Sequence, residues 1–458
     1  MEVARVKSIK RTQRIISVVI LLFIIGMALL VIKLVHESSF YMMNSDVHQF
    51  GYVYDRSGDV LFDGTGAGSY PDNYFLDVGN LIGDDKGQMD NTLVSRNLEK
   101  INNYSFNDGL VPSGGKAAIY TTLDHNANRA VFNAYGYMEG CVSAYNYKTG
   151  EILVCVSLPS LDVTKGYDDL GSFASGTLLS KNMYGTVPGS TQKVSTVISA
   201  IEIMGSNQLF SKSYTCSGRY QNMSGAFIDC HNPYGHGTQN IQEAFENSCN
   251  PFFAQLVEDD DLPLEKLKKQ YSKMGYAING AEMTYIDIDG IECETASTTL
   301  NDPYEFKTQW GCIGQGDTLV SPIQLMMWQS AIANGTGKMT MPHLIDHVTD
   351  TRGKEKEKAF TKFSDKLFSE NTGNAVKQIM LTNGADKYTY LINGYKVGVK
   401  SGTAQVNEGM RENSLLVGFV DDQSFPIAFA ILIENKDSGY LTTEQIAQVL
   451  LDNLKNDL

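Results

Sequence analysis

The chain has 458 residues, of which 42% are apolar and 19% are charged, and its formal net charge is −15. This apolar content is sufficient for buried cores, so the composition excludes an intrinsically disordered protein. The acidic balance argues against nucleic acid as a partner, because phosphate binding requires clustered lysine and arginine. At roughly 150 residues per domain, the length predicts two or three folding units.

A membrane-spanning helix is the first element that the sequence predicts. Residues 15–32 form a run of 18 uncharged residues, and residues up to 35 extend it to the thickness of a bilayer core. A cleaved signal peptide is the alternative, but no small-residue cleavage site follows the run. Five basic residues precede it against the single acid Glu2, so the positive-inside rule places residues 1–14 in the cytoplasm. We therefore expect a single-pass protein of the cell membrane, anchored by residues 15–35, whose remaining chain is extracytoplasmic.

The exported part divides into two predicted domains. Residues 37–115 are polar, with short apolar alternations at 52–54 and 60–62, which indicates a small and mostly β stalk domain. The Pro-Ser-Gly-Gly sequence at 112–115 marks its boundary, so residues 116–458 form the second domain.

The second domain has predicted strands at both ends and helices between them. Five strands are predicted, at residues 140–145, 151–156, 395–399, 415–420 and 427–433, of which the first two form a hairpin. Helices are predicted from Ser190, over 241–248, and at the C-terminus, where Thr442 and Gln445 form a capping box. The charge run at 354–358 is typical of a solvated loop. This order of elements predicts an α+β fold with a largely antiparallel sheet.

Two short motifs pair a hydroxyl with a second polar group. Ser190 and Lys193 lie three residues apart at a predicted helix start, so both side chains can face one cleft. A neutral lysine there would activate the serine as a nucleophile, provided that burial and nearby cations lower its pKa. Ser248 and Asn250 follow the second amphipathic segment and offer a hydroxyl beside an amide. Taken singly, the first pair is equally typical of a helix cap and the second of a turn.

A third motif, Lys400-Ser401-Gly402-Thr403, ends a strand-like run. Because side chains alternate along a strand, Lys400 and Gly402 share one face while Ser401 and Thr403 share the other. One face can therefore present a cation and the other two hydroxyls, and the glycine lets another backbone approach closely. The alternative is an edge-strand terminus with a lysine that prevents aggregation.

In this order, the three motifs resemble the set used by class B penicillin-binding proteins, the monofunctional peptidoglycan D,D-transpeptidases. Further stretches of the chain add to the resemblance, at residues 140–162, 184–193, 235–237, 314–316 and 321–325. The resemblance covers residue 115 to the end, and the short stalk is similar to that of the small PbpA-type members. It implies a penicillin-binding, serine β-lactamase-like transpeptidase domain with an antiparallel sheet flanked by helices.

The resemblance also implies a role for each catalytic residue. Ser190 would attack the D-Ala-D-Ala carbonyl, and Lys193 would accept its proton. Ser248 would relay a proton to the leaving D-Ala, with Asn250 holding the substrate amide. Lys400 would supply positive potential.

The substrate-binding group implied by the resemblance is Ser401, Gly402 and Thr403. The two hydroxyls would hold the terminal carboxylate, and the backbone N–H groups of Ser190 and Thr403 would form an oxyanion hole. Gln192 stands where the family often has Phe, and Ser401 where Thr is common, but neither departure removes a group that the chemistry needs.

No cofactor is implied. The expected partners are peptidoglycan stem peptides ending in D-Ala-D-Ala, β-lactam antibiotics, the membrane through the N-terminal helix, and a SEDS-family glycan polymerase. A D,D-carboxypeptidase or a serine β-lactamase would carry the same motifs, although no Glu-x-x-Leu-Asn sequence matches the deacylating element of class A β-lactamases. The non-enzymatic alternative is a β-lactam sensor or a scaffold of the wall-synthesis complex.

The seven cysteines are too few and too scattered for a disulfide framework. Cys141 and Cys155 fall within the predicted hairpin and are expected to be packed side chains. Cys216 and Cys230, followed by His236, leave three alternatives: free thiols, a disulfide, or a zinc site. Because no fourth ligand is obvious, we expect no metal, with zinc at these three residues as the less favoured alternative.

Overall fold

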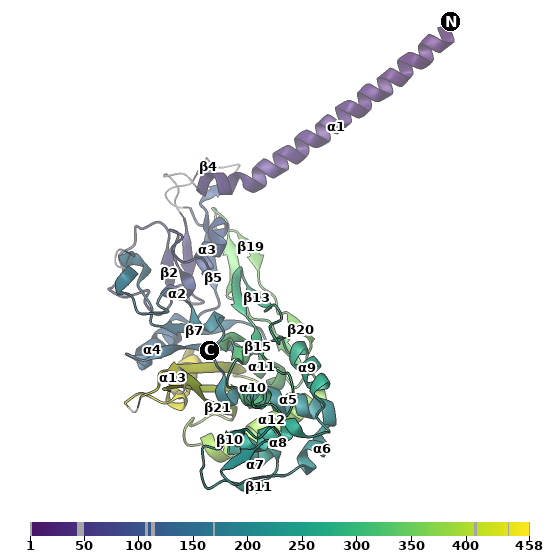
Figure 1. Cartoon of the computed structure of the whole chain (residues 1–458). Helices are drawn as coiled ribbons and strands as arrows, with labels where there is room; N and C mark the ends of the chain where they lie inside the picture. Colours follow the sequence, from purple (N-terminus) through teal and green to yellow (C-terminus); the bar gives the residue numbers. More distant parts are fainter. Residues whose placement is uncertain are drawn as a thin grey trace.

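The computed structural model describes residues 2–43, 50–105, 109–110, 115–167, 170–406, 410–437 and 439–457. Residues 112–114 of the predicted domain boundary lie outside these ranges. Helix α1 (Glu2–Met43) extends away from the rest of the molecule (Figure 1). Within it, residues 9–35 are exposed and contain an 18-residue window with a mean hydropathy of 3.3, and no other helix in the described chain is long and apolar enough to cross a membrane. This stretch includes the predicted span.

A first sheet combines strands from distant parts of the chain. The predicted strands at 52–54 and 60–62 are confirmed as β1 (Tyr52–Tyr54) and β2 (Val60–Asp63). With β5 (Ala118–Thr121), β18 (Ile345–Thr349) and β19 (Glu355–Lys358) they form a sheet of order β19-β18-β5-β1-β2. The sheet thus takes strands from both sides of residue 115. The predicted division of the chain into two domains at this residue stays a prediction.

Strand β19 overturns one expectation. Residues 354–358 were expected to form a loop, but Glu355–Lys358 pair with β18, and all four side chains are exposed. Charges on an edge strand keep it from pairing with other chains, so a solvated charge run is compatible with a strand at this position.

Short helices and turns fill the rest of the N-terminal region. The elements are α2 (Gly79–Ile82), α3 (Leu93–Asn97), η1 (Leu98–Ile101), β3 (Tyr104–Ser105) and β4 (Gly109–Leu110). This region therefore contains more helix than the predicted mostly β stalk.

The central sheet has the order β21-β22-β23-β6-β7, and every neighbouring pair is antiparallel. Its strands are β6 (Glu139–Asn146), β7 (Ile152–Leu158), β21 (Val397–Val406), β22 (Arg411–Val420) and β23 (Ile427–Glu434). All five predicted strands and the hairpin are confirmed. Strands β21 and β22 extend beyond the predicted bounds, because their mutual pairing continues past the apolar stretch that identified them.

Helices cover both faces of this sheet. Helices α4 (His125–Tyr135) and α13 (Thr443–Asp457) pack on one face, and α13 begins with the predicted capping box of Thr442 and Gln445. Helix α11 (Pro322–Ala333) packs on the other face and is buried throughout. Alternation along β23 fits this arrangement, because the small Ala428 and Ala430 face α11 and leave room for it.

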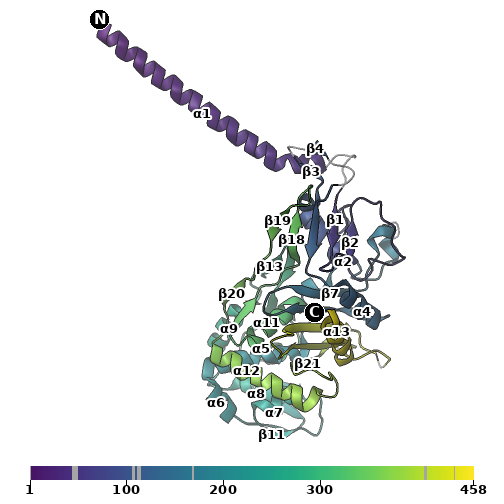
Figure 2. The same cartoon turned by 180° about the vertical axis from the view of Figure 1, so that it is seen from behind.

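A helical part adjoins edge strand β21, at the end of the molecule far from α1 (Figures 1 and 2). Its helices are α5 (Lys193–Met204), α6 (Ser206–Ser211), α7 (Ile241–Glu246), α8 (Asn250–Glu258), α9 (Leu264–Lys273), α10 (Phe306–Ile313) and α12 (Glu370–Asn383). Its small strands and those nearby are β8 (Tyr214–Cys216), β9 (Arg219–Gln221), β10 (Phe227–Asp229), β11 (Gly237–Gln239), β12 (Tyr276–Ile278), β13 (Tyr285–Ile288), β14 (Ile291–Glu294), β15 (Ala296–Thr298), β16 (Leu319–Val320), β17 (Lys338–Thr340) and β20 (Phe363–Lys366).

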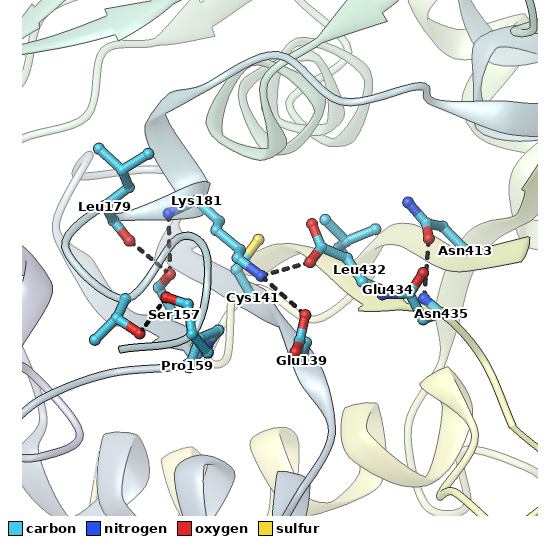
Figure 3. A network of polar contacts seen from close by, with 12 residues as sticks. Glu139, Cys141, Ser157, Pro159, Leu179, Lys181, Asn413, Leu432, Glu434 and Asn435 are labelled. Carbon is cyan, nitrogen blue, oxygen red and sulfur yellow. Dashed lines mark hydrogen bonds and ion pairs between the residues drawn. The ribbon is translucent and has the colours of Figure 1, made fainter. Parts of the chain in front are cut away.

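A polar network attaches the segment after β7 to the central sheet (Figure 3). The Lys181 ammonium forms ion pairs with Glu434 at the end of β23 and with Glu139 of β6, the latter at 3.8 Å. Its backbone N–H donates to Ser157 Oγ of β7 at 2.9 Å. The segment that leads toward Ser190 is therefore held by three strands.

Candidate active site

The hydroxyl of Ser190 lies 2.9 Å from the Lys193 amine. The helix predicted to begin at Ser190 begins instead at Lys193, and Ser190 belongs to a preceding 3₁₀ turn, η5 (Gly189–Gln192). The tighter turn starts at Gly189, which has a positive φ of 54°. Ser190 is half-buried and lines the surface of the cleft, while the Lys193 amine lies buried beneath it.

Two glycines let this turn lie directly against β21. A Cβ at Gly402 would approach the Thr191 nitrogen to 3.0 Å, and a Cβ at Gly189 would approach the Thr403 carbonyl oxygen to 2.6 Å. The sequence pattern predicted a close backbone approach at Gly402, and it is the η5 turn that approaches. Ser190 and the Lys-Ser-Gly-Thr motif are thereby fixed relative to each other.

Lys193 is fully buried among oxygen atoms. Its Nζ lies 2.7 Å from the Ser248 carbonyl oxygen, 3.2 Å from Ser248 Oγ and 2.8 Å from Asn250 Oδ1. Burial, followed by the nearby Lys400 cation, lowers the pKa of Lys193 well below its usual value. A neutral amine has two N–H groups and one lone pair, so it can donate to two of these oxygens and still accept the Ser190 proton.

Ser248 lies between the two buried lysines. Helix α7 ends at Glu246, earlier than the predicted 248, and Ser248 occupies a left-handed turn with a φ of 50°. Its Oγ is 3.1 Å from Lys400 Nζ, which also donates to the Ser401 carbonyl oxygen at 2.8 Å. Burial lowers the pKa of Lys400 to about 7. The Asn250 amide donates to the Asp229 carbonyl oxygen at 3.1 Å, which orients it.

The side chains of the Lys-Ser-Gly-Thr motif alternate between the two faces of β21, as predicted. Lys400 and Gly402 are buried, Ser401 is half-buried and Thr403 is exposed. Tyr388 donates a hydrogen bond to Ser401 Oγ at 2.7 Å, and the Gln315 amide donates to the Thr403 carbonyl oxygen at 3.1 Å. The first contact orients the Ser401 hydroxyl and the second holds the backbone at Thr403, and both residues line the cleft.

The cleft has a volume of about 530 Å³. It is lined by six of the eight predicted site residues: Ser190, Ser248, Asn250, Ser401, Gly402 and Thr403. The other two, Lys193 and Lys400, lie buried beneath it. Trp310 and Phe306, stacked with ring centroids 5.2 Å apart, form an aromatic wall.

Two residues that line the cleft, Gln315 and Trp310, were not predicted as site residues, and neither was Tyr388, which contacts Ser401 from behind it. Gln315 belongs to a Gly-Gln-Gly sequence that contributed to the resemblance, but nothing local assigns its contact with β21. Tyr388 ends a π-helical turn, η6 (Gly384–Tyr388), and Trp310 lies on an ordinary amphipathic helix. No pattern in the sequence places either ring in a site.

Gln192, where the family often has Phe, is accommodated by polar neighbours. It is fully buried, accepts a hydrogen bond from Tyr276 at 2.7 Å and donates one to Tyr271 at 3.3 Å. A buried amide is tolerated when its hydrogen bonds are made, so this departure leaves the turn intact.

The cysteines all carry free thiols and are buried. Cys141 and Cys155 pack in the sheet, as predicted. Cys216 and Cys230 form no disulfide, which removes one of the three alternatives that the sequence left open.

A comparison with protein families decides the assignment of the chain. Residues 140–452, more than half of the chain, match the penicillin binding protein transpeptidase domain. The chain belongs to this family. The transpeptidase fold predicted from the motifs is thereby confirmed.

Comparison with individual proteins agrees with this family assignment. Stage V sporulation protein D of Bacillus subtilis (strain 168) is 30% identical over 359 residues, covering 74% of this chain and 52% of that protein. Peptidoglycan D,D-transpeptidase MrdA of Escherichia coli (strain K12) is 24% identical over 383 residues, covering 74% and 58%. The chain thus spans just over half the length of these relatives.

A solved structure shows the same fold. Penicillin-binding protein A of M. tuberculosis, in its ceftriaxone acyl-enzyme complex, has a TM-score of 0.76 at 18% identity, covering 90% of this chain and 99% of that one.

Proposed function

We propose that this protein is a membrane-anchored peptidoglycan D,D-transpeptidase that acts through a serine acyl-enzyme and binds penicillin covalently. The observation that carries the proposal is the 2.9 Å contact between Ser190 Oγ and the buried amine of Lys193. A nucleophile needs a base that is neutral at working pH, and burial beside Lys400 gives the lysine this character.

Acylation follows from the contacts around the amine. Lys193 takes the Ser190 proton, and the oxygen attacks the carbonyl between the two D-alanines. Backbone N–H groups of Ser190 and Thr403 stabilise the oxyanion, a contribution typically worth about 3 kcal/mol of barrier. The peptide C–N bond then breaks, and the proton passes from Lys193 through Ser248 Oγ, 3.2 Å away, to the departing D-Ala amine.

Substrate recognition would come from β21. Ser401 and Thr403 offer hydroxyls to the terminal carboxylate, while Lys400 provides a positive charge beneath them. The Asn250 amide would hold the substrate's backbone in the extended geometry needed for attack. A β-lactam presents a similar carboxylate and carbonyl, which supports covalent binding at the same serine.

The acyl group is then transferred from Ser190 Oγ to an amine of a second stem peptide, so that a C–N bond forms and the ester C–O bond breaks. Attack by this amine on the ester carbonyl reverses the first sequence: Lys193 receives the amine proton and returns it to Ser190 Oγ. The product is a cross-linked peptide. Transfer to water would instead give a carboxypeptidase, or a β-lactamase if the acyl group were a penicillin.

The anchor would be α1, with the basic residues 1–14 in the cytoplasm and the site outside. The uncharged apolar run at 15–32 and the basic tail before it support this orientation. By resemblance to class B enzymes, we extend the proposal to a SEDS-family glycan polymerase as partner within the membrane.

An acceptor-competition assay tests the proposed reaction. The full-length protein in detergent is given a stem peptide ending in D-Ala-D-Ala together with a labelled acceptor amine, and D-Ala release is compared with cross-linked product. We expect cross-linked product in the wild type and neither product in Ser190→Ala. Hydrolysed peptide without transfer would identify a carboxypeptidase, and D-Ala release by Ser190→Ala would refute the assigned nucleophile.

A further inference from the structure

The rim of the cleft beyond Thr403 carries a negative charge. Gln405 and Glu412 line the cleft there, and they pair with each other across β21 and β22. Because side chains alternate along a strand, Gln405 lies on the same face of β21 as Ser401 and Thr403. Residues directly opposite each other in antiparallel strands share a face, so the exposed Glu412 also belongs to the cleft side of the sheet.

The Glu412 carboxylate has no paired cation. Among the residues that the structure describes, no ion pair or hydrogen bond involves this carboxylate, although the Lys436 N–H donates to the Glu412 carbonyl oxygen at 2.8 Å. The other carboxylate of the cleft, that of Asp229, is paired with Arg219. No lysine or arginine is among the described lining residues, and the histidine of the lining, His231, lies two residues after Asp229. This end of the cleft therefore favours a positively charged group of the substrate.

The backbone of β21 past Thr403 is already hydrogen-bonded. The Gln405 N–H donates to the Gln315 side-chain oxygen at 3.2 Å, while the Gln315 amide donates to the Thr403 carbonyl oxygen at 3.1 Å. The Thr403 oxygen has a second lone pair for a substrate N–H, but the single N–H of Gln405 is taken. Recognition of a substrate beyond its last two residues therefore falls to side chains.

The proposed function, on which this inference rests, places the donor stem peptide along β21. Its terminal carboxylate would lie at Ser401 and Thr403 and its reacting carbonyl at the Thr403 N–H, so the preceding chain runs toward Gln405. One extended residue spans about 3.4 Å. The residue before the two D-alanines would then pass the rim at Gln405 and Glu412.

That residue of a stem peptide carries, on its side chain, the amine that accepts an acyl group in cross-linking. In a stem that has not yet acted as acceptor, the amine is free and positively charged at neutral pH. After cross-linking it is a neutral amide. A carboxylate within reach of the side chain distinguishes the two states, because only the ammonium can form an ion pair with it.

We propose that Glu412 is a specificity-determining residue that selects donor stem peptides whose own amine is still free. A carboxylate next to this amine would be repelled by Glu412, so the preferred side chain carries positive charge alone. The consequence is an order of events: a stem peptide serves as donor before it serves as acceptor.

Competition between two donors in one sample tests this selection. The full-length protein in detergent receives equal amounts of Nα-acetyl-L-Lys-D-Ala-D-Ala, whose side-chain amine is free, and of the Nα,Nε-diacetyl peptide, which mimics a cross-linked stem, together with an acceptor amine. Deuterium in the terminal D-Ala of one peptide lets mass spectrometry assign the released D-Ala. The ratio of the two releases equals the ratio of the kcat/KM values for acylation, whatever the rate of transfer to the acceptor.

We expect the wild type to favour the free amine by about two- to fivefold, the size of an exposed ion pair, and to lose this preference in roughly 1 M salt. Glu412→Gln should abolish the preference, and Glu412→Lys should invert it. Glu355→Gln, which removes an exposed carboxylate from β19 in the first sheet, is the matched control and should keep the wild-type ratio.

Equal release from both peptides by the wild type would overturn this inference and leave the enzyme assignment intact. A preference that Glu412→Gln retains would do the same. If the wild type releases D-Ala from neither peptide, the proposed function fails and this inference fails with it. Because the measurement is a ratio within one sample, a variant that folds only in part lowers both releases and leaves the comparison valid.

Discussion

Two buried lysines on either side of one serine hydroxyl determine the chemistry of the site. Ser248 Oγ is 3.2 Å from Lys193 Nζ and 3.1 Å from Lys400 Nζ. Two adjacent cations in a buried place repel each other, so one of them is held neutral. Lys193 contacts Ser190 Oγ, and both burial and the Lys400 cation lower its pKa, whereas burial alone lowers that of Lys400, so we expect Lys193 to be the neutral member of the pair.

The acylation rate should therefore pass through a maximum as pH rises. Below the lowered pKa of Lys193 the base is protonated and the rate falls; above the pKa of Lys400, about 7, the positive potential is lost and the rate falls again. Cys230 and Cys249 also face Lys193 and raise its pKa, against the larger effects of burial and Lys400. Stopped-flow acylation by penicillin from pH 5 to 9 measures the profile.

Lys400→Arg provides the check on this assignment, because a guanidinium stays charged throughout the range. The falling limb near pH 7 should disappear in this variant while the rising limb remains. A wild-type rate that is independent of pH would contradict the assignment of both lysines.

The Tyr388 hydroxyl should affect substrate binding through Ser401. Removing its 2.7 Å hydrogen bond in Tyr388→Phe should slow acylation at low penicillin concentration by roughly 2–10-fold, the effect of about 0.5–1.5 kcal/mol. Tyr390→Phe is the matched control, because that side chain is 96% exposed. Equal rates in both variants would show that Tyr388 does not position Ser401.

That the residues of the candidate site would come together could largely be predicted, because three short motifs follow one another in a characteristic order. The contacts of Gln315 and Tyr388 could not, since they depend on how α10 and α12 approach β21. Cys249 stood inside a recognised motif, yet only the fold brings it to Cys216 and Cys230.

At the level of elements, the close packing of η5 between β21 and α10 positions the nucleophile. Gly314, which ends α10 with a φ of 99°, touches this turn: a Cβ there would lie 1.8 Å from the Gly189 carbonyl oxygen. Any side chain at Gly314 must therefore displace the turn that carries Ser190.

Gly314→Ala should slow penicillin acylation more than tenfold and lower the free energy of unfolding by about 2 kcal/mol. Acylation kinetics and urea denaturation measure the two effects. Gly316→Ala is the control: its φ is also positive, 67°, but the nearest atom to its Cβ is 3.5 Å away on Trp310. It should lose stability without a comparable loss of acylation. If Gly314→Ala is acylated at the wild-type rate, the packing of Gly314 against η5 does not position Ser190.

Strands that form a short continuous apolar run bounded by turn residues, such as β23, could be predicted from the sequence. Helix α11 was not assigned, because all of its residues are buried and no polar face reveals a helical period. The start of α5 was misplaced by three residues, because a 3₁₀ turn and an α-helix share the same early spacing.

In the whole molecule, α1 lies on one side of the first sheet, and β21, α8 and α10, which contribute residues to the candidate cleft, lie on the other (Figure 1). That sheet includes β18 and β19, more than 200 residues from β1. A division of the chain by local composition could not anticipate this, because a strand's partner is set by the fold. The arrangement would hold the cleft away from a membrane that contains α1.

The proposed topology can be tested with protease. Added to intact protoplasts, protease should degrade the chain beyond residue 43 and spare an N-terminal tag, because residues 1–14 are expected in the cytoplasm. Permeabilised protoplasts, in which the tag is also digested, provide the control. A protected C-terminal domain in intact protoplasts would contradict the orientation.

The most direct test of the enzyme assignment is a peptide map of the full-length protein after exposure to penicillin. The account predicts one adduct per chain, on Ser190, which persists after free penicillin is removed. The adduct should be absent from Ser190→Ala and present in Ser199→Ala, whose buried hydroxyl on α5 only donates to the Ser195 carbonyl oxygen. An adduct on another residue, no adduct, or rapid release of hydrolysed penicillin would contradict it.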